Sequence, residues 1–421
     1  METADLCRLL FILILLALAT TKISLNLVNL RHVRKNLRSI PEEFRNKVDE
    51  EDMVRILNYS SAGTKVENVQ FAVFNGLLIL LIFGGGLNLL ITKAGHFSNY
   101  LLSGLTFFAL TGAIFWLISI PFEIFTTFHI EKVFGFNKQT FSSWLKDLFK
   151  SLLITVIIGG ILGSLILTLI EKSGTYWWLY SWALLLIFGI VLTSLYPILI
   201  APLFNKFTPL DNDDLLNRIK TIGKKSGIEV EGIFKMDAGR RSSHTNAYFT
   251  GLGKSKRIVL FDTLLESMDN EEIASVTAHE AGHWKRKHLL KSMFVSALYS
   301  FAWFFAAGKL IDSNFFYEIF SVSRKIPAAG LFLMGIIWEP VNFFINPFLL
   351  AYSRRNEREA DNAVMELTSE TKPFREALVK LTKENLANLN PHPAYVIFNY
   401  SHPPVTERIR RLRTIEARKN N

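Results

Sequence analysis

Seven long runs of mainly apolar residues constrain this chain more than any other feature. They span roughly 8–27, 68–92, 101–125, 150–170, 176–200, 291–311 and 329–351 of the 421 residues. A helix needs about 20 apolar residues to cross a bilayer, and each run is long enough to do so. Lipid offers the backbone no hydrogen-bond partners, so such runs must be helical. The sequence therefore predicts a mainly α-helical, multi-pass membrane protein with seven transmembrane helices in a lipid bilayer.

The basic residues alternate between the connections. The net charge is +10, and much of it lies after the first and third runs, at Arg31, Arg34, Lys35, Arg38, Arg45, Lys47, Arg55 and Lys65 and then at Lys132, Lys138, Lys146 and Lys150. Basic loops mark the cytoplasmic side of a membrane protein. We therefore expect the N-terminus outside and the C-terminus in the cytoplasm. The excess charge is explained by topology, so no nucleic-acid partner is expected.

Two polar segments are long enough to fold outside the bilayer. We divide the chain into five transmembrane helices over 1–202, a cytoplasmic segment over 203–290, helices six and seven over 291–351, and a C-terminal segment over 352–421. The pattern of residues predicts helices over 211–225, from 271, from about 353, over 372–386 and after 404, and strands over 232–236, 247–250 and 257–261. These segments predict a small cytoplasmic α+β domain. Cys7 is the only cysteine, so no intrachain disulfide can form.

The sequence His279-Glu280-Ala281-Gly282-His283 lies inside one predicted helix. Residues four apart share a helix face, so both imidazoles can bind one metal ion. Glu280 follows the first histidine and can act as the general base for a metal-activated water. This H-E-x-x-H pattern predicts a metalloprotease. The alternative is a helix that carries two histidines and a glutamate by chance.

A catalytic zinc ion needs a third protein ligand and an open position for water. Glu357 and Asp361 follow the seventh apolar run and are also four residues apart. Glu357 can bind the metal while Asp361 accepts the remaining N–H of a ligand histidine. From the spacing alone, a solvated charged helix explains these two residues equally well.

Further motifs resemble those of the type I CAAX prenyl endopeptidases, which are membrane zinc metalloproteases of the gluzincin kind. The resemblance covers nearly the whole chain. It is carried by Ile130-Glu131, Gly135-Phe136-Asn137-Lys138, the run 201–210 (APLFNKFTPL), Ser243-His244-Thr245-Asn246-Ala247-Tyr248, the run 257–264 (RIVLFDTL), His279–His283 with Trp284, Glu357 with Asp361, and Ser401-His402-Pro403-Pro404.

The resemblance implies one zinc ion per chain, held by His279, His283 and Glu357. It implies that His402 stabilises the oxyanion of the tetrahedral intermediate, a role that a histidine or tyrosine donor can fill. It also implies hydrolysis of peptide bonds near the C-terminus of prenylated CAAX proteins. The expected partner is thus a peptide or protein substrate that is lipidated or membrane-associated. Separately, Asn246 begins a predicted strand whose edge can pair with an extended substrate.

Other interpretations remain open at this point. The same site can serve a quality-control protease for misfolded or clogged membrane proteins. A seven-span transporter with a regulatory metal site is the non-enzyme alternative. An intramembrane protease of the site-2 type is disfavoured, because its L-D-G motif is absent. His288 lies five residues after His283, so we expect it at the membrane interface and away from the metal. The expected location is the endoplasmic reticulum membrane in a eukaryote and the inner membrane in a bacterium.

Overall fold

The computed structural model describes residues 3–227, 232–250 and 257–420. Among them, seven helical segments are long and apolar enough to cross a membrane, which confirms the predicted number of spans. They are α1 (Thr3–Lys35), α2 (Glu50–Phe83), α4 (Tyr100–Phe125) continued through η2 (Thr126–Ile130) and α5 (Glu131–Val133), α6 (Phe141–Lys172), η3 (Gly174–Tyr176) with α7 (Trp177–Leu195), η4 (Tyr196–Ile200) and α8 (Ala201–Phe204), α12 (His288–Leu310), and α14 (Pro327–Thr368).

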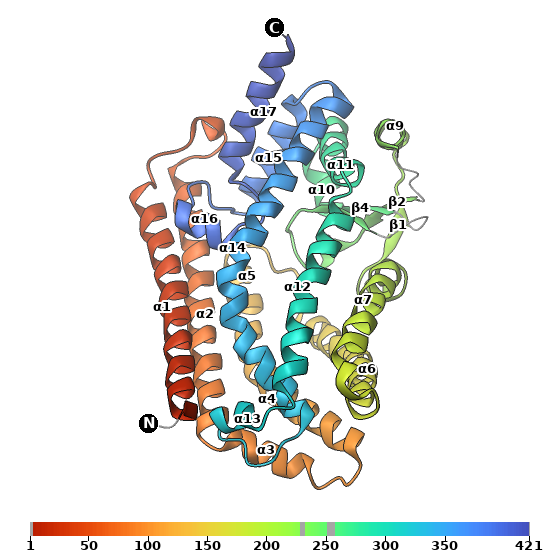
Figure 1. The fold of residues 1–421 in the computed structure, drawn as a ribbon. Coiled ribbons are helices and arrows are strands. Elements are labelled where there is room, and N and C mark those ends of the chain that lie inside the picture. The colour runs from red at the N-terminus through yellow and green to blue at the C-terminus, as the bar shows by residue number, and fades with distance from the viewer. Residues whose placement is uncertain (1–2, 228–231, 251–256, 421) are drawn as a thin grey trace.

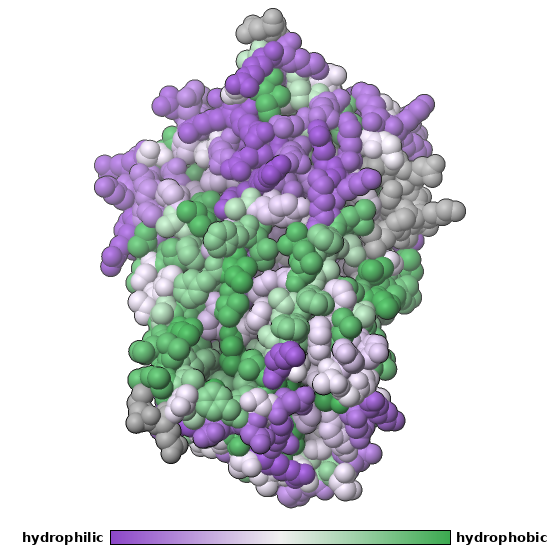
Figure 2. All heavy atoms as spheres, viewed as in Figure 1, coloured by the Kyte–Doolittle hydropathy of each residue, from purple (hydrophilic) through white to green (hydrophobic). Residues whose placement is uncertain are grey.

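The long helices form a bundle with a polar domain at one end (Figure 1). The short helices α3 (Gly86–Ala94) and α13 (Asn314–Ile319) lie at the other end. Figure 2 shows a hydrophobic belt around the middle of the molecule, between two hydrophilic ends. A belt of this kind is what a bilayer requires of the protein surface that it covers. The chain is an integral, multi-pass membrane protein.

The polar domain contains a four-stranded sheet in the order β1-β2-β4-β3. Its strands are β1 (Phe207–Pro209), β2 (Gly232–Met236), β3 (Ala247–Thr250) and β4 (Arg257–Phe261). The sequence predicted β2, β3 and β4 but not the short β1. The turn predicted over 251–256 lies outside the described residues. Strand β3 pairs with β4 in an antiparallel register and is at the edge of the sheet.

The domain's helices come from both polar segments of the chain. They are α9 (Asp213–Ser226), α10 (Asp262–Ser267), α11 (Asn270–Lys285), α15 (Lys372–Glu384), α16 (Pro393–Asn399) and α17 (Val405–Asn420), with the short turns η1 (Glu42–Phe44) and η5 (Ala238–Arg240). The sequence predicted α9, α11, α15 and α17 and missed the short helices α10 and α16. Helix α9 begins two residues later than expected, because Asn212 is its N-cap: the side chain of Asn212 accepts a hydrogen bond from the backbone N–H of Leu215.

One hydrophobic core joins these elements. Buried side chains from α9, α11, β4, α14, α15 and α17 pack together, for example Leu215, Leu260, Ala278, Val364 and Leu412. Helix α14 runs without interruption from the transmembrane bundle into this core. The buried side chains near the C-terminal end of α14 are therefore packed against the domain. This continuity fixes where Glu357 and Asp361 lie.

Candidate metal centre

Helix α11 carries the H-E-x-x-H residues. It starts with a capping box, in which the side chain of Asp269 accepts from backbone N–H groups while the side chain of Glu272 accepts from the backbone of Asp269. His279 and His283 follow on one face of the helix, and their Nε2 atoms are 3.3 Å apart. Only His279 is buried, while His283 is partly exposed. The helix thus presents two imidazole nitrogens to the same point.

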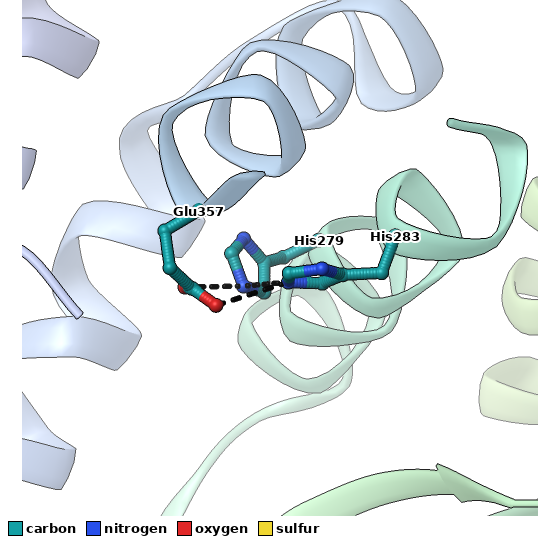
Figure 3. Close-up of side chains that lie close together, drawn as sticks. All are labelled: His279, His283 and Glu357. Atoms are coloured by element: carbon teal, nitrogen blue, oxygen red, sulfur yellow. Dashed lines mark hydrogen bonds and ion pairs between the residues drawn. The ribbon is translucent and has the colours of Figure 1, made fainter. Parts of the chain in front are cut away.

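Helix α14 brings Glu357 to this point from the other side. Its Oε2 lies 3.3 Å from Nε2 of His279, and its Oε1 lies 3.2 Å from Nε2 of His283. Figure 3 shows the three side chains pointing toward one another from two helices. The approach depends on Gly282, where an added Cβ would lie 2.7 Å from Cβ of Ala363. Any larger residue at Gly282 would push α14 and its glutamate away.

These three residues can hold a single metal ion. Each of them offers one ligand atom, and these atoms all lie within 4.8 Å of one another. Oε2 of Glu357 is buried and has no hydrogen bond of normal geometry. Burial lowers the pKa of His279, but its contacts with Asp361 and Glu357 outweigh burial and raise the pKa to about 9. The two carboxylates therefore favour positive charge at this point, which a bound cation would supply.

Asp361 lies directly behind His279. Its Oδ1 is 3.0 Å from Nδ1 of His279, which is the contact expected for a carboxylate that orients a ligand histidine. Asp361 is fully buried and pairs with the buried guanidinium of Arg408 through two hydrogen bonds, of 2.6 and 3.0 Å. Burial lowers the pKa of Arg408, but the ion pair with Asp361 outweighs burial and raises that pKa overall. Arg408 therefore keeps Asp361 ionised in a buried place.

The sequence analysis did not identify Arg408, which lies among several arginines. The position of Arg408 on the predicted helix after Pro404 could have identified it. Val405, Ile409 and Leu412 form the apolar face of that helix, and Arg408 falls on the same face. A charged residue on a buried helix face needs a partner in the core.

We expect Arg408→Leu to lower the free energy of unfolding by about 3–5 kcal/mol. The change leaves the carboxylate of Asp361 buried without its ion-pair partner. Removing one partner of a buried ion pair typically lowers the free energy of unfolding by this amount. Thermal unfolding in detergent measures the effect. Arg411→Leu is the matched control, because Arg411 is on the same helix and contacts the neutral side chain of Asn362. Equal midpoints for the two variants would contradict this account of Arg408.

Glu280 and His402 are close to the candidate ligands, Glu280 along the helix and His402 by direct contact. Glu280 is on α11, one residue after His279, and is half-buried. His402 lies in the loop before α17, with its Nδ1 2.7 Å from Oε2 of Glu357. Its side chain is 59% exposed, whereas that of Glu357 is 6% exposed. His402 therefore contacts a buried candidate ligand and is itself open to solvent.

Asn246 precedes the edge strand β3, which packs against α11. Its side chain is exposed and accepts a hydrogen bond from the backbone N–H of Ala247. Its backbone oxygen accepts from Phe261 and so belongs to the sheet. The structure thus places Asn246 at the start of an edge strand beside the helix of His279 and His283.

The expectation for His288 was wrong in one respect. His288 begins the membrane helix α12 and is not one of the three converging ligand residues, but it does not point away from them: it is buried, and its ring contacts the ring of His283. The prediction assumed one continuous helix. In the structure α11 ends at Lys285, and Lys287 has a left-handed backbone with φ of 56°. This break turns His288 back toward His283.

A second polar cluster supports the start of β3. Nε2 of His244 lies 3.1 Å from Oε2 of Glu131, and Nδ1 of His244 lies 2.8 Å from Oδ1 of Asn385. The phenol of Tyr59 donates to the same glutamate. The hydrogen bond with Glu131 raises the pKa of His244. Two of the motifs noted in the sequence are therefore in direct contact and anchor the segment before Asn246 to the membrane helices.

Two family models together match most of the chain. The family described as CAAX prenyl protease N-terminal, five membrane helices, matches residues 29–206. Peptidase family M48 matches residues 209–416, which include all the residues discussed above except Glu131 and Tyr59.

Similar relatives cover most of the chain. The CAAX prenyl protease 1 homolog of Arabidopsis thaliana is 38% identical over 74% of each chain. CAAX prenyl protease 1 of Saccharomyces cerevisiae is 31% identical over 91% of this chain and 90% of its own. The crystal structure of S. mikatae Ste24p matches with a TM-score of 0.90 at 29% identity, covering 96% of this chain and 98% of that chain. The chain belongs to the CAAX prenyl protease 1 family, the membrane-embedded metalloendopeptidases of peptidase family M48.

Proposed function

We propose that the protein is a zinc endopeptidase that removes C-terminal residues from prenylated CAAX proteins at the cytoplasmic face of a membrane. The observation that carries the proposal is the convergence of His279, His283 and Glu357 on one point. A tetrahedral zinc ion with ligand distances of about 2.0–2.1 Å separates neighbouring ligand atoms by about 3.3–3.4 Å. The two Nε2 atoms here are 3.3 Å apart, and each has an oxygen of Glu357 at a similar distance, Oε2 at 3.3 Å from His279 and Oε1 at 3.2 Å from His283. These three donors therefore suit one zinc ion per chain.

The proposed roles follow from the positions of the side chains. When bound, zinc polarises a carbonyl group and makes water more acidic. Glu280 takes a proton from the attacking water and passes it to the leaving amine, as a general base and then acid. His402 donates a hydrogen bond to the oxyanion that develops on the carbonyl oxygen. Asp361 orients His279 and does not bind the metal.

The edge of the sheet supports the proposed binding mode. Among the residues that the structure describes, strand β3 pairs on one side only, with β4. An extended peptide can add to such an edge through backbone hydrogen bonds. Asn246 stands at the start of this strand and would contact the substrate there. A substrate anchored in the bilayer by its lipid would reach this edge by diffusion in two dimensions.

The substrate class is supported by the names of the relatives, which are CAAX prenyl proteases. Basic residues in the first and third connections favour a cytoplasmic polar domain and C-terminus. This side of the membrane is also where a prenylated protein would meet the site. In a eukaryote we place the protein in the endoplasmic reticulum membrane, and in a bacterium in the inner membrane.

The test is cleavage of matched peptides by the purified, reconstituted protein. One C-terminal peptide carries an isoprenoid on its cysteine, the other carries a free cysteine, and mass spectrometry identifies the products. The proposal predicts cleavage after the modified cysteine, with a higher kcat/KM for the prenylated peptide. Equal cleavage of both peptides, together with degradation of an unfolded membrane protein, would favour a quality-control protease instead.

We expect His402→Ala to lower kcat by about 10²–10³-fold, the usual loss for one oxyanion donor. KM should change little, because an interaction made only in the transition state does not stabilise bound substrate. Steady-state kinetics and metal content are measured together. A higher KM at constant kcat would make His402 a substrate-binding residue, and loss of metal would make it a ligand.

A further inference from the structure

His288 forms a bridge between a candidate metal ligand and a carboxylate. Its Nδ1 lies 3.0 Å from Nδ1 of His283, and its Nε2 lies 3.2 Å from Oε2 of Glu359. The His288 residue is only 3% exposed, although it begins the membrane helix α12. A buried imidazole with both nitrogens in contact with polar groups is not placed there for packing alone.

The contacts allow only one arrangement of protons when a metal is bound. Nε2 of His283 faces the cluster of ligand atoms, so its Nδ1 carries the proton and donates to Nδ1 of His288. Nδ1 of His288 is then the acceptor, so the proton of this neutral ring is on Nε2. That N–H donates to Glu359, whose other oxygen accepts from Arg355. Each N–H group in the series from His283 through His288 to Glu359 therefore has an acceptor.

The two candidate ligand histidines are thus supported in different ways. His279 contacts the buried carboxylate of Asp361 directly. His283 contacts a neutral imidazole, and the carboxylate of Glu359 lies one ring farther away. Ligand histidines almost always donate their second N–H to a carboxylate, carbonyl or water, and this partner fixes the tautomer and the orientation of the ring.

We propose that His288 and Glu359 act as a relay that positions His283 for metal binding. This inference rests on the proposed metal site at His279, His283 and Glu357. His288 does not contact the metal, because its Nδ1 is engaged with the far side of the ring of His283. Its role is to hold that ring in the tautomer that leaves Nε2 free. The break at Lys287 serves this purpose, because a continuous helix would carry His288 away.

The test measures metal affinity as well as activity. Zinc affinity of the metal-free, full-length protein is determined by competition with a chromophoric chelator, and the visible spectrum of bound Co²⁺ reports the ligand geometry. We expect His288→Leu to lower zinc affinity by about 10–100-fold and to change the Co²⁺ spectrum. His288→Asn keeps an acceptor near the position of Nδ1, so it should restore part of the affinity.

Glu359→Leu has a matched control on the same helix. It should also weaken zinc binding, because Nε2–H of His288 loses its acceptor. Glu366→Leu removes another carboxylate of α14 that is paired with basic side chains, here Lys285 and Arg286, and should leave zinc affinity unchanged. If His288→Leu does not fold, the comparison of Glu359→Leu with Glu366→Leu decides the question.

Two outcomes separate the relay from the metal site itself. If the wild-type protein binds no zinc with appreciable affinity, the proposed function fails. If the wild type binds zinc, but His288→Leu and Glu359→Leu bind it equally well with an unchanged Co²⁺ spectrum, the relay is wrong and the proposed function stands.

Discussion

Glu280→Gln is expected to lower proteolysis by about 10²–10⁴-fold while metal binding is retained. General acid–base catalysis contributes about this much, and the amide cannot accept the proton of the attacking water. Glu280 is not among the three converging ligand residues, so its loss should leave the metal in place. Single-turnover cleavage of a prenylated peptide, with metal content measured on the same sample, provides the test.

Glu271→Gln is the control for this change. Glu271 is an exposed glutamate on the same helix, paired with Arg218 at the surface, and its variant should cleave like the wild type. Near wild-type turnover in a metal-loaded Glu280→Gln protein would mean that another group acts as the base.

Glu357→Ala is expected to remove most of the bound metal and, with it, activity. The change takes away the only carboxylate among the three candidate ligands, so two neutral imidazoles remain. Asp361→Asn should act more weakly, by about 10–100-fold in metal affinity or activity, because Asp361 supports His279 from behind. Metal analysis after dialysis against a weak chelator ranks the two variants. Full occupancy in both would place the third ligand on another residue.

Local patterns in the sequence identified the two pairs of residues that the structure brings together at the candidate site. His279 and His283 are one helical turn apart, and so are Glu357 and Asp361, and this spacing decides which side chains share a face. The contact between the two pairs could not be derived from spacing. It arises because Gly282 lets α14 approach α11, a fact that depends on how two distant segments pack. Here the resemblance to a known family supplied what the periodicity could not.

The residues that the sequence analysis missed act across longer distances. Arg408 reaches Asp361 from another helix, 47 residues along the chain. The side chain of His288 was predicted to point the wrong way, because the segment Lys285-Arg286-Lys287 contains no glycine or proline that would indicate a break between α11 and α12. A lysine with positive φ is uncommon, so a residue-by-residue reading favours a continuous helix. In the structure the chain turns at Lys287, directly before the membrane helix α12 begins at His288.

The central claim is that one metal ion, held by His279, His283 and Glu357, is required for proteolysis. Titration of zinc into the metal-free protein tests this most directly, with cleavage of a prenylated peptide measured at each step. The account predicts no cleavage without metal and a linear rise that ends at one zinc ion per chain. Cleavage that survives complete removal of metal, or a rise that ends at the same point in Glu357→Ala as in the wild type, would contradict it.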